Sequence, residues 1–319
     1  MMFHVSSAPH VHSRVTTPGL MRDVLIALAP AMVISVIYFG WKAALMILLS
    51  VASAVGTEAL IQKVTHKPIM IRDLSAAVTG VLLALNLPIG AYWWLPIVGS
   101  AIAIAIAKQA FGGLGFNFMN PALVGRAVLL ASWPNAMTGA ACKAPTIFAG
   151  SVDAVSSATP LALLKEGAVE SVPSLGNLLI GNCGGVIGEV CTLALLAGGL
   201  YLLVRRVITW HIPVIYIGTV AVMTLLCTGF DFYLTAVYVL SGGLFLGAFF
   251  MATDYVSNPS TIKGQSIFAV GCGIITVIIR LYGGYPEGVS YAILLMNVAT
   301  PIIDKYVRDR AFGEVKANA

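Results

Sequence analysis

Long apolar runs recur from one end of this chain to the other. Most have the length, about 17–25 residues, that a helix needs to cross the hydrocarbon core of a bilayer. Of the 319 residues, 59% are hydrophobic and only 10% are charged, whereas soluble domains carry about 25% charge. The sequence therefore predicts an all-α polytopic membrane protein.

We predict about ten transmembrane helices from the apolar runs. The predicted spans are 22–40, 43–62, 74–88, 92–110, 121–134, 176–204, 209–227, 232–251, 265–280 and 287–304. The chain then divides into a leader (1–21), a first transmembrane half (22–134), a loop (135–175), a second half (176–304) and a basic tail (305–319). The dipeptide Asn-Pro at 120–121 and again at 258–259 hints at duplicated halves, although it is also an ordinary turn pair.

The lysines and arginines between the predicted spans are unevenly distributed. With the N-terminus in the cytoplasm, thirteen of the 18 fall on the inner side and four on the outer side, and Arg126 lies within a span. Cytoplasmic connections carry the excess of positive charge. We therefore expect both termini to be cytoplasmic and the loop 135–175 to be outside. The lysines and arginines form no single basic cluster, so no nucleic acid is expected as a partner.

Nothing in the sequence predicts a metal site or an iron–sulfur cluster held by this chain alone. The five cysteines include no C-x-x-C pair, and His10 and His12 have no further ligand nearby. Iron–sulfur clusters need sets of closely spaced thiolates.

A polar segment centred on a threonine stands out in the long loop. Residues 153–160 read Asp-Ala-Val-Ser-Ser-Ala-Thr-Pro. Thr159 followed by Pro160, with Gly167 further on, is typical of a short helix capped by the threonine hydroxyl. A second interpretation is that this hydroxyl carries a phosphate ester, because a helix start also stabilises an anion.

The residues before the threonine decide between these interpretations. Asp153, Ser156, Ser157 and Ala158 complete the pattern D-x-x-S-[G/S]-A-T at Thr159. The pattern resembles the flavin-attachment motif of two related proteins: the D subunit of the Rnf electron-transport complex and the B subunit of the sodium-translocating NADH:quinone oxidoreductase. Ser157 stands where the family often has glycine. The resemblance implies FMN joined to Thr159 by a flavin transferase.

The resemblance covers nearly the whole chain. It continues through the segments 21–24, 27–31, 73–80, 108–115, 120–126, 252–254, 283–288 and 294–297. It implies a complex that passes electrons from reduced ferredoxin to NAD⁺ and exports Na⁺ or H⁺. Implied partners are the A, B, C and E subunits of that complex and its FMN-bearing G subunit, with membrane lipid around them. A non-covalent riboflavin and a multi-pass location in a bacterial or archaeal inner membrane, with Thr159 on the periplasmic side, are also implied.

Two carboxylates inside predicted spans are candidates for an ion pathway, because charged groups are costly in a membrane. Glu189 falls in the middle of the span 176–204, where an ion pathway and a packing role are equally supported. Glu58 falls near the inner end of the second span, where a simple interface role is slightly favoured.

Three further polar residues are candidates for a second flavin site. They are Arg126, Asn120 and Asn258. We expect Arg126 to lie toward the inner half of its span and therefore closer to a non-covalent flavin than to Thr159. The turn 285–287 is expected to face a partner subunit.

The sequence contains no evident nucleophile, triad or general base, so the chain is expected to act as a redox subunit and not as an enzyme alone. Two other functions are compatible with its composition. Ten spans and duplicated halves also suit a solute permease or channel, and a scaffold subunit without a cofactor would look similar. Flavin fluorescence on a denaturing gel separates the first function from both alternatives.

Overall fold

The computed structural model describes residues 15–138, 141–142, 145, 158–189, 191–284 and 287–308. Within these ranges the chain is helical, and the β-structure is limited to one isolated bridge between Pro88 and Val186. The predicted all-α class is therefore confirmed for the described residues. The motif residues Asp153, Ser156 and Ser157 lie outside them.

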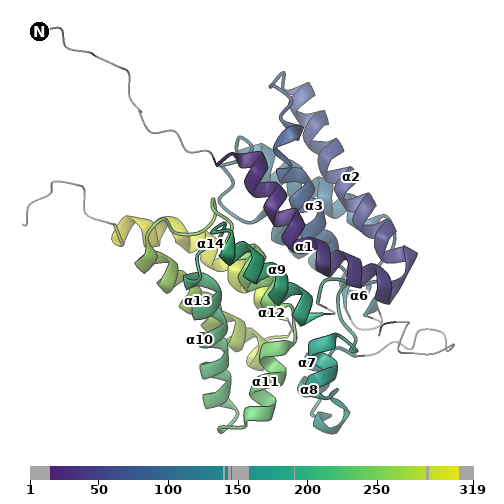
Figure 1. Ribbon diagram of the computed structural model, residues 1–319, viewed down its shortest axis with the longest axis vertical. Coiled ribbons are helices and arrows are strands. Elements are labelled where there is room, and N and C mark those ends of the chain that lie inside the picture. The colour runs from purple at the N-terminus through teal and green to yellow at the C-terminus, as the bar shows by residue number, and fades with distance from the viewer. Residues whose placement is uncertain are drawn as a thin grey trace, which may run out of the picture.

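The helices follow the predicted order along the chain (Figure 1). The first half contains α1 (Thr17–Phe39), α2 (Trp41–Val64), α3 (Ser75–Leu85), α4 (Leu95–Ile102), α5 (Pro121–Ser132) and α6 (Pro134–Met137). Then come α7 (Pro160–Lys165) and α8 (Leu175–Ile180). The second half contains α9 (Thr192–Val204), α10 (His211–Cys227), α11 (Phe232–Leu240), α12 (Leu244–Leu246), α13 (Ile262–Tyr282) and α14 (Val289–Tyr306).

Two helices continue as π-helical segments, which are rare and often occur at functional sites. The first, η2 (Ala103–Lys108), extends α4, and the second, η6 (Gly247–Met251), extends α12. Three short 3-10 segments complete the described helical structure: η1 (Ile71–Asp73), η3 (Gln109–Phe111) and η5 (Val169–Ser171).

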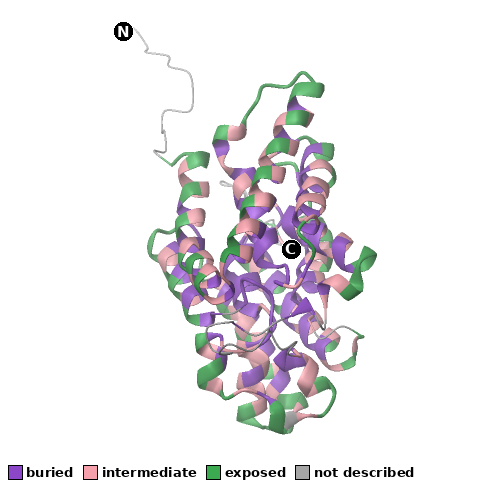
Figure 2. Cartoon of the chain, turned by 90° about the vertical axis from the view of Figure 1, so that its right-hand side faces the viewer, coloured by how far each residue is buried: buried purple, intermediate pink, exposed green. Residues whose placement is uncertain are grey.

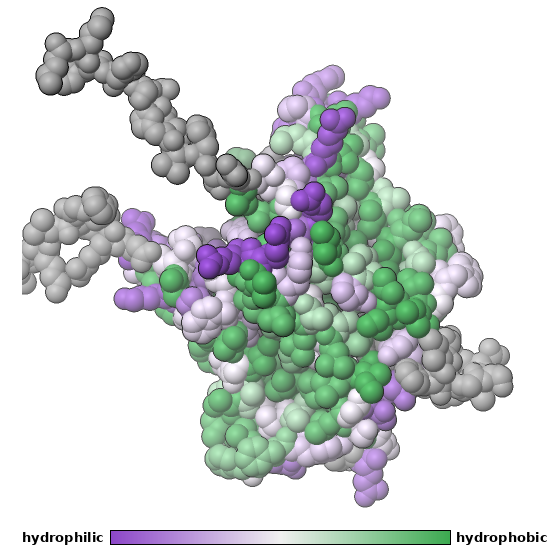
Figure 3. All heavy atoms as spheres, in the orientation of Figure 1, coloured by the Kyte–Doolittle hydropathy of each residue, from purple (hydrophilic) through white to green (hydrophobic). Residues whose placement is uncertain are grey.

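Three described helices, α1, α2 and α13, are long and apolar enough to cross a membrane. A fourth candidate joins α11 to α12 and η6 through a bend of 58°. The other predicted spans include shorter apolar helices such as α3, α5, α9 and α10. On the face in Figure 3, hydrophobic side chains cover most of the lower and right-hand body. Strongly hydrophilic ones gather at the top and across the upper left, with a few at the lower edge. A multi-pass arrangement follows, while the number of ten spans stays a prediction.

The prediction of one continuous span over 176–204 is wrong. α8 ends before Gly181, whose φ of 95° favours glycine, and α9 begins only at Thr192. The chain between them turns back onto α3, where Gly188 N–H donates to Leu85 O at 2.7 Å. A Cβ on Gly188 would lie 2.6 Å from Leu85 Cβ, so only glycine permits this approach. Glu189 therefore lies in a helix break and not in the middle of a helix.

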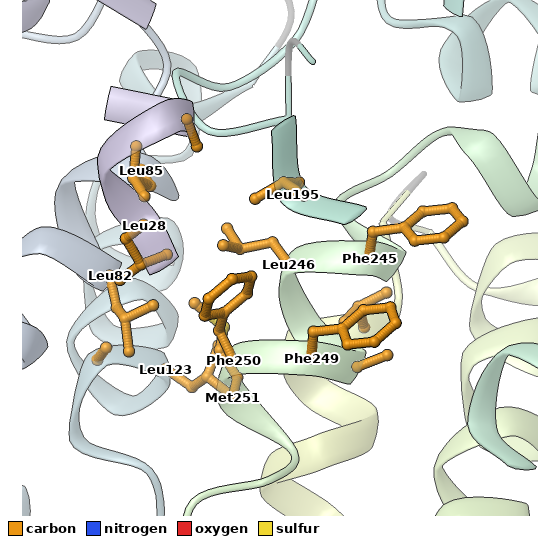
Figure 4. Close-up of a cluster of buried hydrophobic side chains, with 14 of the residues drawn as sticks. Leu28, Leu82, Leu85, Leu123, Leu195, Phe245, Leu246, Phe249, Phe250 and Met251 are labelled. Carbon is orange, nitrogen blue, oxygen red and sulfur yellow. The ribbon is translucent and has the colours of Figure 1, made fainter. Parts of the chain in front are cut away.

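One large hydrophobic core joins both halves of the chain, and its buried residues gather in the centre of the molecule (Figure 2). Figure 4 shows residues of α12 and η6 facing those of the first half. Leu246 and Phe250 lie between Leu195 of α9 and the leucines of α1 and α3. The helices α1 and α9 approach closely, since a Cβ on Gly198 would lie 2.1 Å from Ala27 O.

Candidate functional site

Thr159 is the N-cap residue of α7, as the sequence predicts. Its hydroxyl oxygen accepts a hydrogen bond from Ala162 N–H at 3.3 Å, and Pro160 occupies the first turn. The residue is 7% exposed. In Figure 1, α7 and α8 lie at the lower end of the molecule, away from the first turn of α1 and the last turn of α2.

Thr159 lines a cavity of about 120 Å³, which we call the threonine cavity. Its wall is formed by α5, by the residues around Cys142, by α7 and by the start of α14. The polar or reactive groups on this wall include Arg126, Cys142, Thr159, Glu287, Ser290 and Tyr291. Ala158, the second described residue of the attachment motif, also lines it.

Arg126 supplies a cation to the threonine cavity, although we expected it to lie apart from Thr159. Its guanidinium donates to Asn86 Oδ1 at 3.0 Å and to Ser290 Oγ at 2.8 Å, and it forms an ion pair with Glu287. Its Nε is buried and has no hydrogen-bond partner among the described residues. Three partners thus fix the position of the Arg126 guanidinium, and its Nε–H remains for a further acceptor.

The Cys142 thiol on the same wall is kept neutral. Burial raises its pKa to about 12, and the nearby carboxylates of Glu287 and Glu189 act in the same direction, opposed by Arg126. A thiol with such a high pKa is a poor nucleophile at neutral pH, because the thiolate is the reactive form.

A second cavity, of about 90 Å³, lies between the two π-helical segments, and we call it the π-helix cavity. Its wall includes Lys108 of η2, Phe249 and Phe250 of η6, and the polar side chains of Asn120 and Asp254. The Asn120 amide caps α5 by accepting from Ala122 N–H at 3.0 Å and donates to Met251 O at 3.2 Å.

The three candidates for a second flavin site line three different cavities. Arg126 lines the threonine cavity and Asn120 the π-helix cavity. Asn258 lines a neighbouring cavity of about 170 Å³ with Tyr255 and Gln265. The structure therefore does not bring these three residues together.

Glu58 is buried and paired with a cation, while its position relative to the membrane boundary stays a prediction. Its carboxylate forms an ion pair with Lys108 Nζ at 2.8 Å, and their side chains are 1% and 3% exposed. Gln109 donates to Glu58 at 2.8 Å, and Lys108 also donates to Ser75 Oγ at 2.6 Å. Because Lys108 and Ser75 line the π-helix cavity, this ion pair supports one of its walls.

Sequence reasoning missed several of these groups. Asn86, Lys108 and Ser290 were not predicted as site residues, and Glu287 was assigned to a turn that faces a partner. The sequence does hold one signal that could have found the charged partners. Arg126 and Glu58 lie within predicted spans, and each needs a buried partner of opposite charge there. The sequence does not say which of the remaining charges supplies it.

The apolar helices and the buried, paired charges define a multi-pass membrane protein. The chain belongs to the NQR2, RnfD, RnfE family, whose model matches residues 4–313. It is 54% identical over 314 residues to the D subunit of the Na(+)-translocating ferredoxin:NAD(+) oxidoreductase complex of Acetobacterium woodii, covering 98% of this chain and 96% of that one.

Two more distant relatives carry related names. The chain is 46% identical over 323 residues to the D subunit of the proton-translocating ferredoxin:NAD(+) oxidoreductase complex of Clostridium ljungdahlii, covering 98% of this chain and 96% of the relative. It is 37% identical over 352 residues to the D subunit of the ion-translocating oxidoreductase complex of Escherichia fergusonii, covering 99% and 100%. The resemblance to the Rnf D subunit is confirmed.

Proposed function

We propose that this chain is the D subunit of an ion-translocating ferredoxin:NAD⁺ oxidoreductase complex and carries FMN as a phosphoester on Thr159. Membership of the family and the names of the relatives support the complex. The attachment motif supports the cofactor. The observation that carries the proposal is that Thr159 and Arg126 line the same cavity.

The residues of the threonine cavity suit a flavin phosphate. The unpaired Nε–H of Arg126 is a buried donor, and charge-assisted hydrogen bonds between arginine and phosphate are among the stronger ones. Asn86 and Ser290 hold the guanidinium in place. The flavin supplies the electron-transfer chemistry, while the protein supplies position, electrostatics and exclusion of water. The neutral Cys142 thiol does not compete as a nucleophile.

We assign a second, non-covalent flavin, expected to be riboflavin, to the neighbourhood of the π-helix cavity. Two phenylalanines and the amide of Asn120 offer it an apolar wall and a polar group. Asp254 on the same wall accepts from Ser257 at 3.0 Å and from Asn117 at 3.4 Å, so its carboxylate is held in place.

The complex is proposed to contain the A, B, C, E and G subunits as well, with the G subunit as the electron partner of the FMN at Thr159. We propose that α7 lies on the outer side of the membrane, which the separation of α7 from the first turn of α1 supports. Electron transfer is proposed to drive export of Na⁺ or H⁺. The two most similar relatives reported above are named for different ions, so identity alone does not choose between them.

A denaturing gel viewed under ultraviolet light tests the attachment site. Cells that contain the flavin transferase should yield a fluorescent band at the mass of this chain, and the band should be dark in Thr159→Ala and in cells without the transferase. Loss of the cap costs only about 1 kcal/mol, so Thr159→Ala should still fold. Ser174→Ala is the matched control, because Ser174 precedes α8 and makes no capping hydrogen bond through its side chain.

A dark wild-type band from cells that flavinylate other proteins would rule out the FMN-bearing function and favour a scaffold or permease. A fluorescent Thr159→Ala band would move the attachment to another residue. Mass spectrometry of the peptide that contains Thr159 gives the same answer independently.

A further inference from the structure

The break between α11 and α12 brings together groups that the electron relay does not use. α11 ends at Leu240, and α12 starts at Leu244 after a bend of 58°. Gly242 and Gly243 in the break have φ values of 75° and 64°, which only glycine adopts readily. Ser241 N–H still donates to Val237 O at 3.0 Å. The Gly242 N–H and the carbonyl groups of Ser241 and Gly242 bond instead to side chains from elsewhere in the chain.

Glu189 and Arg280 supply these partners from two other segments. Glu189, in the break between α8 and α9, accepts a hydrogen bond from Gly242 N–H through Oε1. Arg280 of α13 donates to Tyr238 O, to Ser241 O at 2.9 Å and to Gly242 O at 3.2 Å. The carboxylate thus accepts from an N–H group before α12, and the guanidinium donates to C=O groups after α11. Helix dipoles favour a negative charge at a helix start and a positive charge at a helix end.

Three buried polar atoms at this break have no hydrogen-bond partner among the described residues. They are Glu189 Oε2, Ser241 Oγ and Arg280 Nε. Glu189 is 8% exposed and Arg280 is 3% exposed. A buried carboxylate oxygen without a donor costs free energy. A proton bound to Oε2 would remove the charge and so relieve this cost.

A proton fits this position better than a metal cation does. Hard metal cations such as Ca²⁺ bind about six or more oxygen ligands. The carbonyl oxygens of Ser241 and Gly242 are already bound by Arg280, whose positive charge also repels a second cation. A proton needs only the single oxygen that is free.

Glu189 lies close to the helix that starts at Thr159. It accepts from Gly242 N–H, and Gly242 packs against Leu161 of α7, since a Cβ on Gly242 would lie 2.3 Å from that side chain. Glu189 also interacts with Arg126 and Glu287, which line the threonine cavity, and with Arg280. Among the described residues, the thiols of Cys142 and Cys183 also interact with it. The two carboxylates and two guanidiniums of this set balance in charge, and Glu166, a further carboxylate on the cavity wall, is exposed. An added negative charge in the cavity therefore draws a proton to the buried carboxylate that lacks a donor.

We propose that Glu189 is a redox-linked proton-binding site: it takes up a proton when the cofactor at Thr159 gains an electron, and releases it when the electron leaves. The inference rests on the proposed function. The electron comes from a one-electron carrier of a partner subunit, and the proton comes from water and binds Oε2 to form a neutral carboxylic acid. On reoxidation the electron passes to the next carrier and the proton returns to water.

Proton uptake during electrochemical reduction of the purified complex tests this inference. A pH-indicator dye in unbuffered solution reports the protons bound, and Glu189→Gln should bind one proton fewer than wild type for each complex reduced. Glutamine preserves the shape and can still accept from Gly242 N–H. Glu170→Gln is the matched control, because Glu170 is an exposed carboxylate of the same region and should leave the uptake unchanged.

In-gel fluorescence of each variant separates failure of this inference from failure of the proposed function. If the bands are fluorescent and Glu189→Gln takes up as many protons as wild type, the inference is wrong while the relay stands. If the Glu189→Gln complex does not assemble, infrared difference spectra between the oxidised and reduced wild-type complex test the inference. A carbonyl band of a protonated glutamic acid should appear on reduction, and its absence would overturn the inference.

Discussion

Glu58 and Lys108 form an ion pair 2.8 Å long that solvent hardly reaches, with side-chain exposures of 1% and 3%. The first comes from α2 and the second from the π-helical end of α4. Ser75 and Gln109 add hydrogen bonds to it. The pair joins α2 to the end of α4, and Ser75 adds the start of α3. This geometry leads to the first prediction.

Removal of one partner should destabilise the protein far more than removal of both. We expect Glu58→Gln or Lys108→Met alone to lower the unfolding free energy by about 3–5 kcal/mol, because a buried charge is left unpaired. The double variant should recover much of this loss. Thermal unfolding in detergent measures the effect.

The ion pair between Arg205 and Asp23 is the control for this prediction. It spans 3.2 Å, and the Arg205 side chain is 54% exposed. Arg205→Gln should therefore cost only about 0–1 kcal/mol. Equal losses for the buried and the exposed pair would contradict the prediction.

Charge changes on the wall of the threonine cavity should shift the midpoint potential of the proposed FMN in opposite directions. Arg126→Gln removes a positive charge and should lower the potential, while Glu287→Gln removes a negative charge and should raise it. An effect of about 1.4 kcal/mol corresponds to about 60 mV for a one-electron couple. Spectroelectrochemical titration of the complex measures both variants, and shifts of the same sign would refute the placement of the flavin.

The two glycines of the helix break should differ in their tolerance of alanine. Both have positive φ, which costs a non-glycine residue about 1–2 kcal/mol. A Cβ on Gly242 would also lie 2.3 Å from Leu161 and 2.5 Å from Arg280, whereas a Cβ on Gly243 meets nothing within 4 Å. Gly242→Ala should therefore unfold at a clearly lower temperature than Gly243→Ala. Similar melting temperatures would show that the break is loosely packed.

Alkylation should distinguish the five cysteines. Because burial raises the pKa of Cys142 to about 12, its thiol is almost entirely protonated at pH 8. Cys142 should thus resist a membrane-permeant maleimide in the native protein and react after denaturation. Cys227, which is exposed, should react first and serves as the internal reference. Mass spectrometry of the labelled peptides follows both sites, and fast labelling of native Cys142 would contradict its buried position.

Much of the helical order could be predicted from the sequence, because apolar runs and their polar interruptions mark most helices directly. The break at 181–191 could not. Gly184, Gly185 and Gly188 resemble the small residues that pack between membrane helices. What ends the helix is the contact of Gly188 with Leu85, and that contact connects residues far apart in the chain.

Single residues of the site could be predicted from the sequence, but their arrangement in space could not. Thr159 follows from its motif, and its capping hydrogen bond is confirmed. Arg126 follows from its position inside a span, but its proximity to Thr159 depends on how α5 packs against α7 and α14. Glu58 was correctly singled out as a charge inside a span, yet its partner Lys108 was counted among the cytoplasmic charges because it lies at the end of an apolar run.

The central position of α12 and η6 bears on how the chain can be divided into fragments. Leu246 and Phe250 fill space that the first half of the chain leaves open. An N-terminal fragment ending in the long loop would lack Leu246 and Phe250. It would therefore expose the apolar side chains of α1 and α3 that these two residues cover. Coexpressed fragments of the two halves should therefore become stable only after they associate.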